Sequence, residues 1–239
     1  MRVTRLYIDA TLDVGQCIAL NQASSHYLTT VLRAKQNHNI TLFNGQGGEY
    51  DGTITTLHKR TSMISINGFT DISRESNCPV TLLQGISRQD RMDFSIQKAT
   101  ELGVQQIIPV FCQRSQKLTN PEKKHDHWQG IIISACEQSG RTQLPLLRPP
   151  QTLSETLQQP YDLGLFLDTT STTPWHQITP KGINIATLIG PEGGFTEEEQ
   201  GLIKEQQFQA ISLGPRILRT ETAALAAITL VMHTWGDLN

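Results

Sequence analysis

The chain has 239 residues, of which 37% are hydrophobic and only 6% aromatic, and its formal net charge at pH 7 is −2. This composition indicates a soluble protein of one large or two modest domains. The charge excludes a protein that coats nucleic acid by bulk electrostatics, although it permits a local basic face. No stretch approaches the roughly 20 apolar residues of a membrane span, and the first residues alternate in polarity, unlike a signal peptide. We therefore expect a cytoplasmic protein with no membrane partner.

Residues 1 to about 70 are predicted to be rich in β-strands, because short apolar or alternating runs are separated by turns that contain Gly and Asn. One helix is expected at 24–35, with a serine as its cap and Tyr27, Leu28, Val31 and Leu32 on one face. The segment NGQGGEY at 44–50 resembles a nucleotide loop, but its place between two predicted strands favours a hairpin turn. These features predict a small barrel-like domain.

The polar stretch 71–79 is the predicted linker, since it has no periodicity and ends in a proline. Strands and helices alternate beyond it, which predicts an α/β domain with a mostly parallel sheet covered on both faces. We expect domains at 1–72 and 73–239. The expected strands lie in 80–86, 106–111, 144–149, 161–168, 183–190 and 210–214, and the expected helices in 91–103, 127–140, 196–207 and 220–235.

The four cysteines are widely scattered and form no CxxC pair, so neither a disulfide framework nor a zinc knuckle is indicated. Cys17, Cys78, Cys112 and Cys136 are expected to be small core side chains. His125 and His127 have no evident further ligand, so we expect a solvated helix start there and no metal. The motifs of phosphate loops, zinc proteases and serine-nucleophile elbows are all absent.

Two glycine-proline turns follow consecutive predicted strands, GPEGG at 190–194 and GPRILRTET at 214–222. Ligands of open parallel sheets lie beyond the carboxyl ends of the strands, and paired glycines let backbone N–H groups approach a ligand closely. The two loops are therefore predicted to wall one pocket for a flat molecule with polar edges.

Structural interpretations compete with this one. Thr196 and Glu199 fit a capping box at a helix start, and Thr220 fits the cap of the last helix, with Glu221 in its first turn. Arg216 and Arg219 fit either solvated surface residues or ligand-binding residues. The residues alone leave these alternatives open.

IGPEGGFTEEE at 189–199 followed by LGPRILRTETAALAA at 213–227 resembles the RsmE family of bacterial ribosomal RNA methyltransferases, of the SPOUT class. RMDFSIQKATELGV at 91–104, ACEQSGR at 135–141 and HYLTTVLR at 26–33 agree with the resemblance, which spans nearly the whole chain. It implies a PUA-like RNA-binding barrel, a SPOUT-type parallel sheet with a C-terminal trefoil knot, and a homodimer. It also implies methyl transfer from S-adenosyl-L-methionine to N3 of U1498 in the 16S ribosomal RNA of the small subunit.

The resemblance and the loop argument together assign site residues. Arg219 and Glu221 are the candidate catalytic residues, as anion stabiliser and general base. Gln138 and Arg141 are expected to reach across a dimer. Expected RNA contacts are Arg2, Arg5, Arg33, Lys35, Arg88 and Arg91. Expected cofactor contacts are Leu167, Ile189, Gly190, Gly193, Gly194, Leu213, Gly214, Ile217, Leu218, Thr222 and Ala223.

Two other functions stay open at this point. One is a non-catalytic RNA-binding or ribosome-assembly module with the same barrel and no cofactor. The other is a methyltransferase that acts on transfer RNA, another RNA or a protein.

Overall fold

The computed structural model describes residues 4–238. The chain divides into two compact units, one formed by Met1–Glu75 with Cys136–Leu144 and the other by Ser76–Ala135 with Pro145–Asn239. The predicted domains end and begin close to this division, but residues 136–144, which the prediction gives to the second domain, group with the first unit. Within residues 4–238, no helix combines the length and apolar content needed to cross a membrane.

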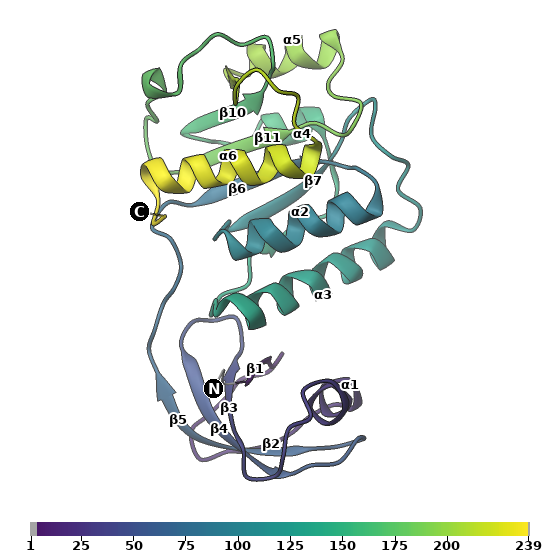
Figure 1. The fold of residues 1–239 in the computed structure, drawn as a ribbon, viewed down its shortest axis with the longest axis vertical. Coiled ribbons are helices and arrows are strands. Elements are labelled where there is room, and N and C mark those ends of the chain that lie inside the picture. The colour runs from purple at the N-terminus through teal and green to yellow at the C-terminus, as the bar shows by residue number, and fades with distance from the viewer. Residues whose placement is uncertain (1–3, 239) are drawn as a thin grey trace. The chain divides into compact units, whose positions relative to one another are not determined.

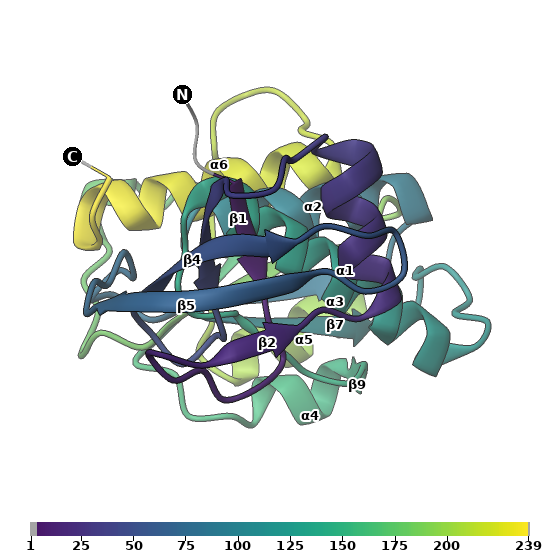
Figure 2. The ribbon, with the colours of Figure 1, turned by 90° about the horizontal axis from the view of Figure 1, so that it is seen from below.

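The N-terminal unit is built on a five-stranded sheet of order β1-β3-β4-β5-β2, in which β1 and β3 are parallel and the other pairs antiparallel (Figure 2). Glycines with positive φ turn the chain between β3 and β4, so the predicted hairpin at 44–50 is confirmed. Leu28, Leu42 and Ile64 are wholly buried in its core. The strands are β1 (Thr4–Tyr7), β2 (Cys17–Ala19), β3 (Asn39–Phe43), β4 (Glu49–Thr56) and β5 (Met63–Thr70).

The helix of this unit differs from its prediction. α1 (Gln22–His26) begins after Asn21, whose side chain accepts from the Ser24 amide, and a π-helical segment (Tyr27–Val31) continues it. The amide of Leu32 donates to the Tyr27 carbonyl at 3.0 Å, a bond of π-helical spacing. Because this wider turn rotates later residues away from the α-helical stripe, Val31 is 61% exposed rather than part of the buried face.

The C-terminal unit contains a seven-stranded sheet of order β12-β10-β11-β6-β7-β8, with β9 also paired to β7 (Figure 1). All of its pairs are parallel. The strands are β6 (Val80–Gly85), β7 (Gln106–Phe111), β8 (Leu146–Leu147), β9 (Gln151–Thr152), β10 (Leu163–Leu167), β11 (Ile185–Ile189) and β12 (Gln209–Ile211). The helices are α2 (Gln89–Glu101), α3 (Pro121–Ser139), α4 (Leu153–Leu157), α5 (Glu197–Glu205) and α6 (Thr220–Trp235), with a 3₁₀ turn at Trp175–Gln177.

Helices cover both faces of this sheet. α6 packs against α2, β6 and β11 (Figure 1). Leu153 and Leu157 of α4 and Ile203 of α5 join a separate core cluster with sheet residues such as Leu83 and Leu188. β6 and β11 are buried along their whole length, as strands covered on both faces must be. The predicted α/β fold with a parallel sheet is confirmed.

The order of the strands brings distant segments together. β12 lies at one edge of the sheet, beyond β10, whereas α6 lies on β11 and β6 in its middle. The chain must therefore return from the edge to the middle through residues 212–219. This return passes the ends of β10 and β11.

Candidate active site

The carboxyl ends of three neighbouring strands meet at one edge of the parallel sheet. Leu167 of β10 is in register with Ile211 of β12, and Phe166 is in register with Leu188 of β11. The loop 190–196 leaves β11 at this edge and the loop 212–219 leaves β12 beside it. The topology thus places both glycine-containing loops where parallel sheets bind their ligands.

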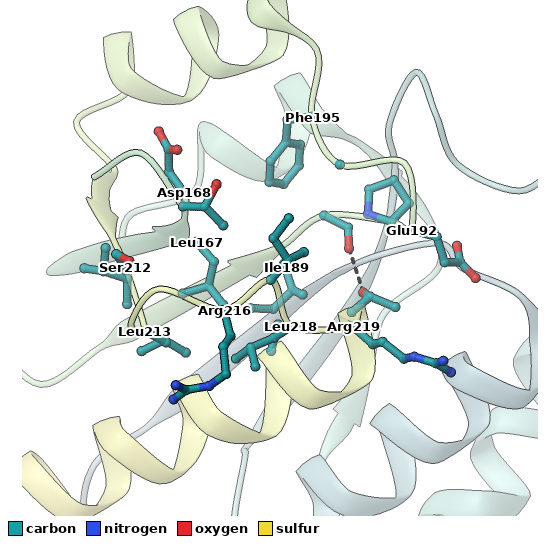
Figure 3. A pocket seen from close by; sticks show the side chains of 18 of the residues that line it. Leu167, Asp168, Ile189, Glu192, Phe195, Ser212, Leu213, Arg216, Leu218 and Arg219 are labelled. Atoms are coloured by element: carbon teal, nitrogen blue, oxygen red, sulfur yellow. Dashed lines mark hydrogen bonds between the residues drawn. The ribbon is translucent and has the colours of Figure 1, made fainter. Parts of the chain in front are cut away.

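The two loops line one cavity of about 400 Å³. Figure 3 shows Leu167, Ile189 and Leu218 close together in its interior. Its volume falls in the range of pockets for small molecules, which are roughly 300 to 1,000 Å³. The prediction that the two loops share a pocket is confirmed.

The loop after β11 takes a conformation that needs glycine. Gly194 has φ +67°, and its amide donates to the carbonyl of Pro191 at 2.9 Å. A Cβ at Gly194 would meet no other protein atom within 4 Å, and Gly194 lines the cavity. The base of the loop is crowded instead, because a Cβ on Gly85 at the end of β6 would lie 2.6 Å from the Pro191 nitrogen.

The loop after β12 turns at Gly214, whose φ is +98°. The hydroxyl of Ser212 donates across the turn to the Gly214 carbonyl at 3.3 Å. Leu213 and Leu218 are half-buried and line the cavity, whereas Ile217 lines it with 88% of its surface exposed. An apolar side chain of this exposure marks the open side of the cavity.

The start of α6 differs from its prediction. Arg219, not Thr220, occupies the N-cap position, and it makes no side-chain cap hydrogen bond. The Thr220 hydroxyl donates to the Gly190 carbonyl at 2.6 Å, the bond drawn in Figure 3. Because the hydroxyl bonds to a carbonyl of the neighbouring loop, it does not cap its own helix.

The capping box at the start of α5 is confirmed. Thr196 accepts from the Glu199 amide at 3.2 Å, and the Glu199 carboxylate accepts from the Thr196 amide at 2.9 Å. The same carboxylate accepts from the amide of Gln113 at 2.7 Å, and it is buried. Glu199 thereby fixes the end of the loop 190–196 to the chain that follows β7.

Charged side chains gather at the rim of the cavity. The guanidinium of Arg91 lies 3.8 Å from the carboxylate of Glu192 and 4.0 Å from that of Glu221. Glu192 also accepts from the backbone amide of Arg88 at 2.9 Å. Arg91, Glu192 and Arg219 line the cavity, whereas Glu221 does not. One Glu221 oxygen is buried and has no hydrogen-bond partner among the described residues.

Comparison with known proteins identifies the family. A family model described as an RNA methyltransferase domain matches residues 74–232, and one described as an RNA methyltransferase PUA domain matches residues 20–65. A Buchnera aphidicola protein named ribosomal RNA small subunit methyltransferase E is 36% identical, covering 100% of this chain and 99% of the relative. The chain belongs to the ribosomal RNA small subunit methyltransferase E family.

Solved structures of similar proteins agree over the full length. The ribosomal RNA small subunit methyltransferase E of Neisseria gonorrhoeae, bound to S-adenosyl methionine, has a TM-score of 0.92 and 39% identity and covers 100% of both chains. A Legionella pneumophila protein in complex with bound SAM has a TM-score of 0.96 and 36% identity, again over 100% of both chains. The SPOUT-type fold and the PUA domain implied by the resemblance are confirmed.

Most of the residues proposed for the cofactor site of this methyltransferase line the cavity. Two do not. A Cβ on Gly193 would lie 3.0 Å from Arg114, whose guanidinium donates to the Gly193 carbonyl, and Thr222 lines a different, apolar hollow on α6. The remaining predicted residues that line the cavity are Leu167, Ile189, Gly190, Gly194, Leu213, Gly214, Ile217, Leu218 and Ala223.

Several residues that line the cavity were not predicted from the sequence. Asp168 and Thr169 directly follow β10, and Phe195 and Gln200 follow the glycines of the first loop. Asp168 could have been predicted, because ligands of parallel sheets bind beyond the carboxyl ends of the strands, and Asp168 directly follows β10. Phe195 and Gln200 had no such signal, because their pattern matches an ordinary helix start.

The basic residues proposed in the N-terminal unit differ in their surroundings. Arg5 forms an ion pair with Glu49, and Arg141 is buried and forms an ion pair with Glu75. Both guanidinium groups thus have a carboxylate partner within the chain, and their contacts to RNA or to a second subunit stay predictions. Arg33 and Lys35 are exposed. Arg2 lies outside the described residues.

The cysteines take no part in the site. Burial raises the pKa of Cys112 and of Cys136 to about 12, so both remain uncharged thiols at neutral pH. Cys78 and Cys136 are buried as predicted, but the prediction is wrong for Cys17, which is exposed on an edge strand. Among residues 4–238, no three His, Cys, Asp or Glu side chains form a metal-binding group.

Proposed function

We propose that this chain is an S-adenosyl-L-methionine-dependent methyltransferase that modifies N3 of U1498 in 16S ribosomal RNA. The observation that carries the proposal is the single cavity lined by both glycine-containing loops at the carboxyl edge of the sheet. Family membership supports the reaction class, and the Neisseria gonorrhoeae relative was solved with S-adenosyl methionine bound.

The cavity suits this cofactor in shape and chemistry. Leu167, Ile189 and Leu218 provide apolar walls for a flat adenine ring. The backbone groups around Gly194 and Gly214 present donors and acceptors for its polar edge, and no Cβ stands in front of them. The open space beside Gly194 is where a side chain would exclude a ligand.

When bound, the cofactor supplies a methyl group activated on its sulfonium, and the chain provides orientation. Positioning two bound reactants contributes roughly 7 to 11 kcal/mol to lowering a barrier. A general base contributes about 10²- to 10⁴-fold, or roughly 3 to 5 kcal/mol. Geometry therefore outweighs proton removal in this reaction, and the loops that shape the cavity carry most of the catalysis.

Removal of the N3 proton leaves negative charge on the uracil ring. Arg219 is exposed where α6 begins and lines the cavity, so its guanidinium is placed to stabilise this charge. Glu221 is the candidate acceptor of the proton, through its carboxylate. The guanidinium of Arg91 lines the cavity and lies 4.0 Å from that carboxylate, so it is placed to hold Glu221 beside the cavity.

The substrate must present an unpaired base. N3 lies on the Watson–Crick edge, so the uridine has to be extruded or lie in an open loop before methyl transfer. Arg33, Lys35, Arg88 and Arg91 are the remaining candidates for contacts to flanking phosphates, which position RNA without reading its sequence.

We also propose a homodimer, formed through the outward side of α6. Leu225, Ala226 and Leu230 line an open apolar hollow there together with Phe94 of α2, which is 43% exposed. Exposed apolar surface of this kind marks interaction sites. Gln138 is exposed and remains a proposed contact to the second subunit.

Leu225→Glu is expected to convert the dimer into a monomer, because a carboxylate at the centre of a self-complementary interface would face its own copy. Light scattering coupled to size exclusion measures the mass directly. A wild-type monomer at micromolar concentration, or an unchanged dimer in the variant, would contradict this assignment.

Two measurements test the methyltransferase proposal. Titration calorimetry with S-adenosylmethionine should detect one saturable site per chain, and its absence would favour a non-catalytic RNA-binding module. Incubation with small ribosomal subunits that lack the modification should then produce reverse-transcription arrest at U1498. Arrest at another position, or methylation of transfer RNA instead, would overturn the substrate assignment while leaving the reaction class intact.

A further inference from the structure

Gln84 is a buried amide side chain in the centre of the sheet. It lies on β6, whose six residues are all buried, and its own exposed fraction is 0%. An amide in an apolar environment is unfavourable unless it is hydrogen-bonded. Its nitrogen Nε2 donates to the Thr220 hydroxyl at 3.0 Å and to the Gly85 carbonyl at 3.1 Å. Gln84 does not line the cavity.

The chain of hydrogen bonds continues through Thr220 to the first glycine loop. A threonine hydroxyl has one hydrogen, and because Gln84 supplies a donor to it, that hydrogen is free for the Gly190 carbonyl. The resulting O···O distance is 2.6 Å. The three residues therefore form a hydrogen-bond relay, in which Gln84 donates to Thr220 and Thr220 donates to Gly190.

This relay holds the only hydrogen-bonding group of one peptide unit. The peptide between Gly190 and Pro191 has no N–H, because its nitrogen belongs to proline. Its carbonyl is therefore the one group by which hydrogen bonds can orient it, and Thr220 holds that carbonyl. The backbone of Gly85 packs against the other side of the same peptide, where a Cβ would lie 2.9 Å from the Gly190 carbonyl carbon.

The relay joins β6 to two segments whose residues line the cavity, the loop after β11 and the start of α6. Gln84 belongs to β6, Gly190 begins the loop after β11, and Thr220 begins α6 directly between the candidate catalytic residues Arg219 and Glu221. A shift of one element is transmitted to the other two through these two hydrogen bonds, of which the bond between Gln84 and Thr220 is buried away from competing water.

We propose that Gln84 and Thr220 are positioning residues that set the first glycine loop and the start of α6 in the geometry that binds the methyl donor. This inference rests on the proposed function for the identity of the ligand, but the coupling of loop and helix does not. Gln84 touches no ligand in this arrangement and acts through Thr220.

Thr220→Val is the primary test, because it keeps the side-chain shape and removes the hydroxyl. We expect the dissociation constant for S-adenosylmethionine, measured by calorimetry, to rise about three- to tenfold, the effect of one net hydrogen bond. Thr220→Ser restores the hydroxyl and should restore affinity. The matched control is Thr156→Val, a buried threonine whose hydroxyl donates at 2.8 Å to the Thr152 carbonyl beside its own short helix.

Hydrogen exchange followed by mass spectrometry gives a readout without any ligand. In the free protein, Thr220→Val should accelerate exchange in peptides covering 188–196, whereas Thr156→Val should not. If the wild-type chain does not bind the cofactor, the proposed function fails, yet this exchange result still tests the relay. Unchanged exchange in Thr220→Val, or no recovery in Thr220→Ser, would overturn the inference.

Gln84→Met removes the buried amide at similar volume and completes a double-mutant cycle with Thr220→Val. Because the two residues act in one chain, the double variant should lose scarcely more affinity than Thr220→Val alone. Strictly additive losses in the logarithm of the dissociation constant would mean that the two residues act separately, and would refute the relay.

Discussion

Gly194→Val is expected to abolish binding of S-adenosylmethionine while the chain stays folded. Gly194 has φ +67°, a conformation that costs an ordinary side chain about 1 to 2 kcal/mol and a β-branched one more. No other protein atom lies within 4 Å of the added Cβ, so the valine does not disturb the core, and Gly194 lines the cavity where it would obstruct a ligand. We expect the dissociation constant to rise by about 100-fold or more, equivalent to ~2.7 kcal/mol.

Gly15→Val separates backbone strain from obstruction of the cavity. Gly15 has φ +90° and also has no protein atom within 4 Å of an added Cβ, but it belongs to the N-terminal unit and does not line the cavity. Both variants should lose a similar amount of stability in urea denaturation, and only Gly194→Val should lose cofactor affinity. Unchanged affinity in Gly194→Val would remove this loop from the cofactor site.

Arg219→Ala is expected to reduce turnover far more than cofactor affinity. The guanidinium is exposed at the first turn of α6, so removing it leaves the packing of the cavity intact. Loss of one group that stabilises developing negative charge typically lowers kcat by about 10²- to 10³-fold. Single-turnover methylation of small subunits measures this effect, and calorimetry should find the cofactor affinity nearly unchanged. Equal losses of turnover and of cofactor affinity would mean that Arg219 binds the cofactor and does not stabilise the transition state.

Glu221→Gln tests how much of the methylation rate depends on proton removal by Glu221 and how much on anion stabilisation by Arg219. If Glu221 accepts the N3 proton, the amide should lower kcat, because it cannot act as the base. If Arg219 alone makes the uridine sufficiently acidic, Glu221→Gln should retain nearly full turnover. Arg148→Ala, an exposed arginine that does not line the cavity, is the matched control for the loss of positive charge in Arg219→Ala.

Local patterns predicted the elements wherever one physical preference dominated. The capping box of Thr196 and Glu199 was readable because two side chains and two amides three residues apart satisfy each other. The buried strands β6 and β11 were readable because parallel strands covered on both faces are apolar throughout. Val31 was misplaced because a π-helical segment breaks the helical period, and nothing in the local sequence announces it.

The partners of polar side chains were decided by residues far away in sequence. Thr220 has the form of a helix cap, but the Gly190 carbonyl, thirty residues earlier, takes its hydroxyl. The guanidinium of Arg141 likewise forms an ion pair with the carboxylate of Glu75, which lies far earlier in the sequence but in the same N-terminal unit. Such outcomes depend on which buried group lacks a partner, and that follows only from the packed fold.

The sequence by itself determined the α/β alternation, the glycine turns at two strand ends and, through its resemblance to a known family, the reaction class. Hydrophobic period and backbone freedom are local properties, so they can be read residue by residue. Only the tertiary structure decided that β12 lies beyond β10, that the return through 212–219 closes the cavity, and that Gln84, Thr220 and Gly190 form one relay. These features depend on the order of the strands in the sheet. That order is decided when segments far apart in the sequence compete for the same neighbouring strands and the same buried surface.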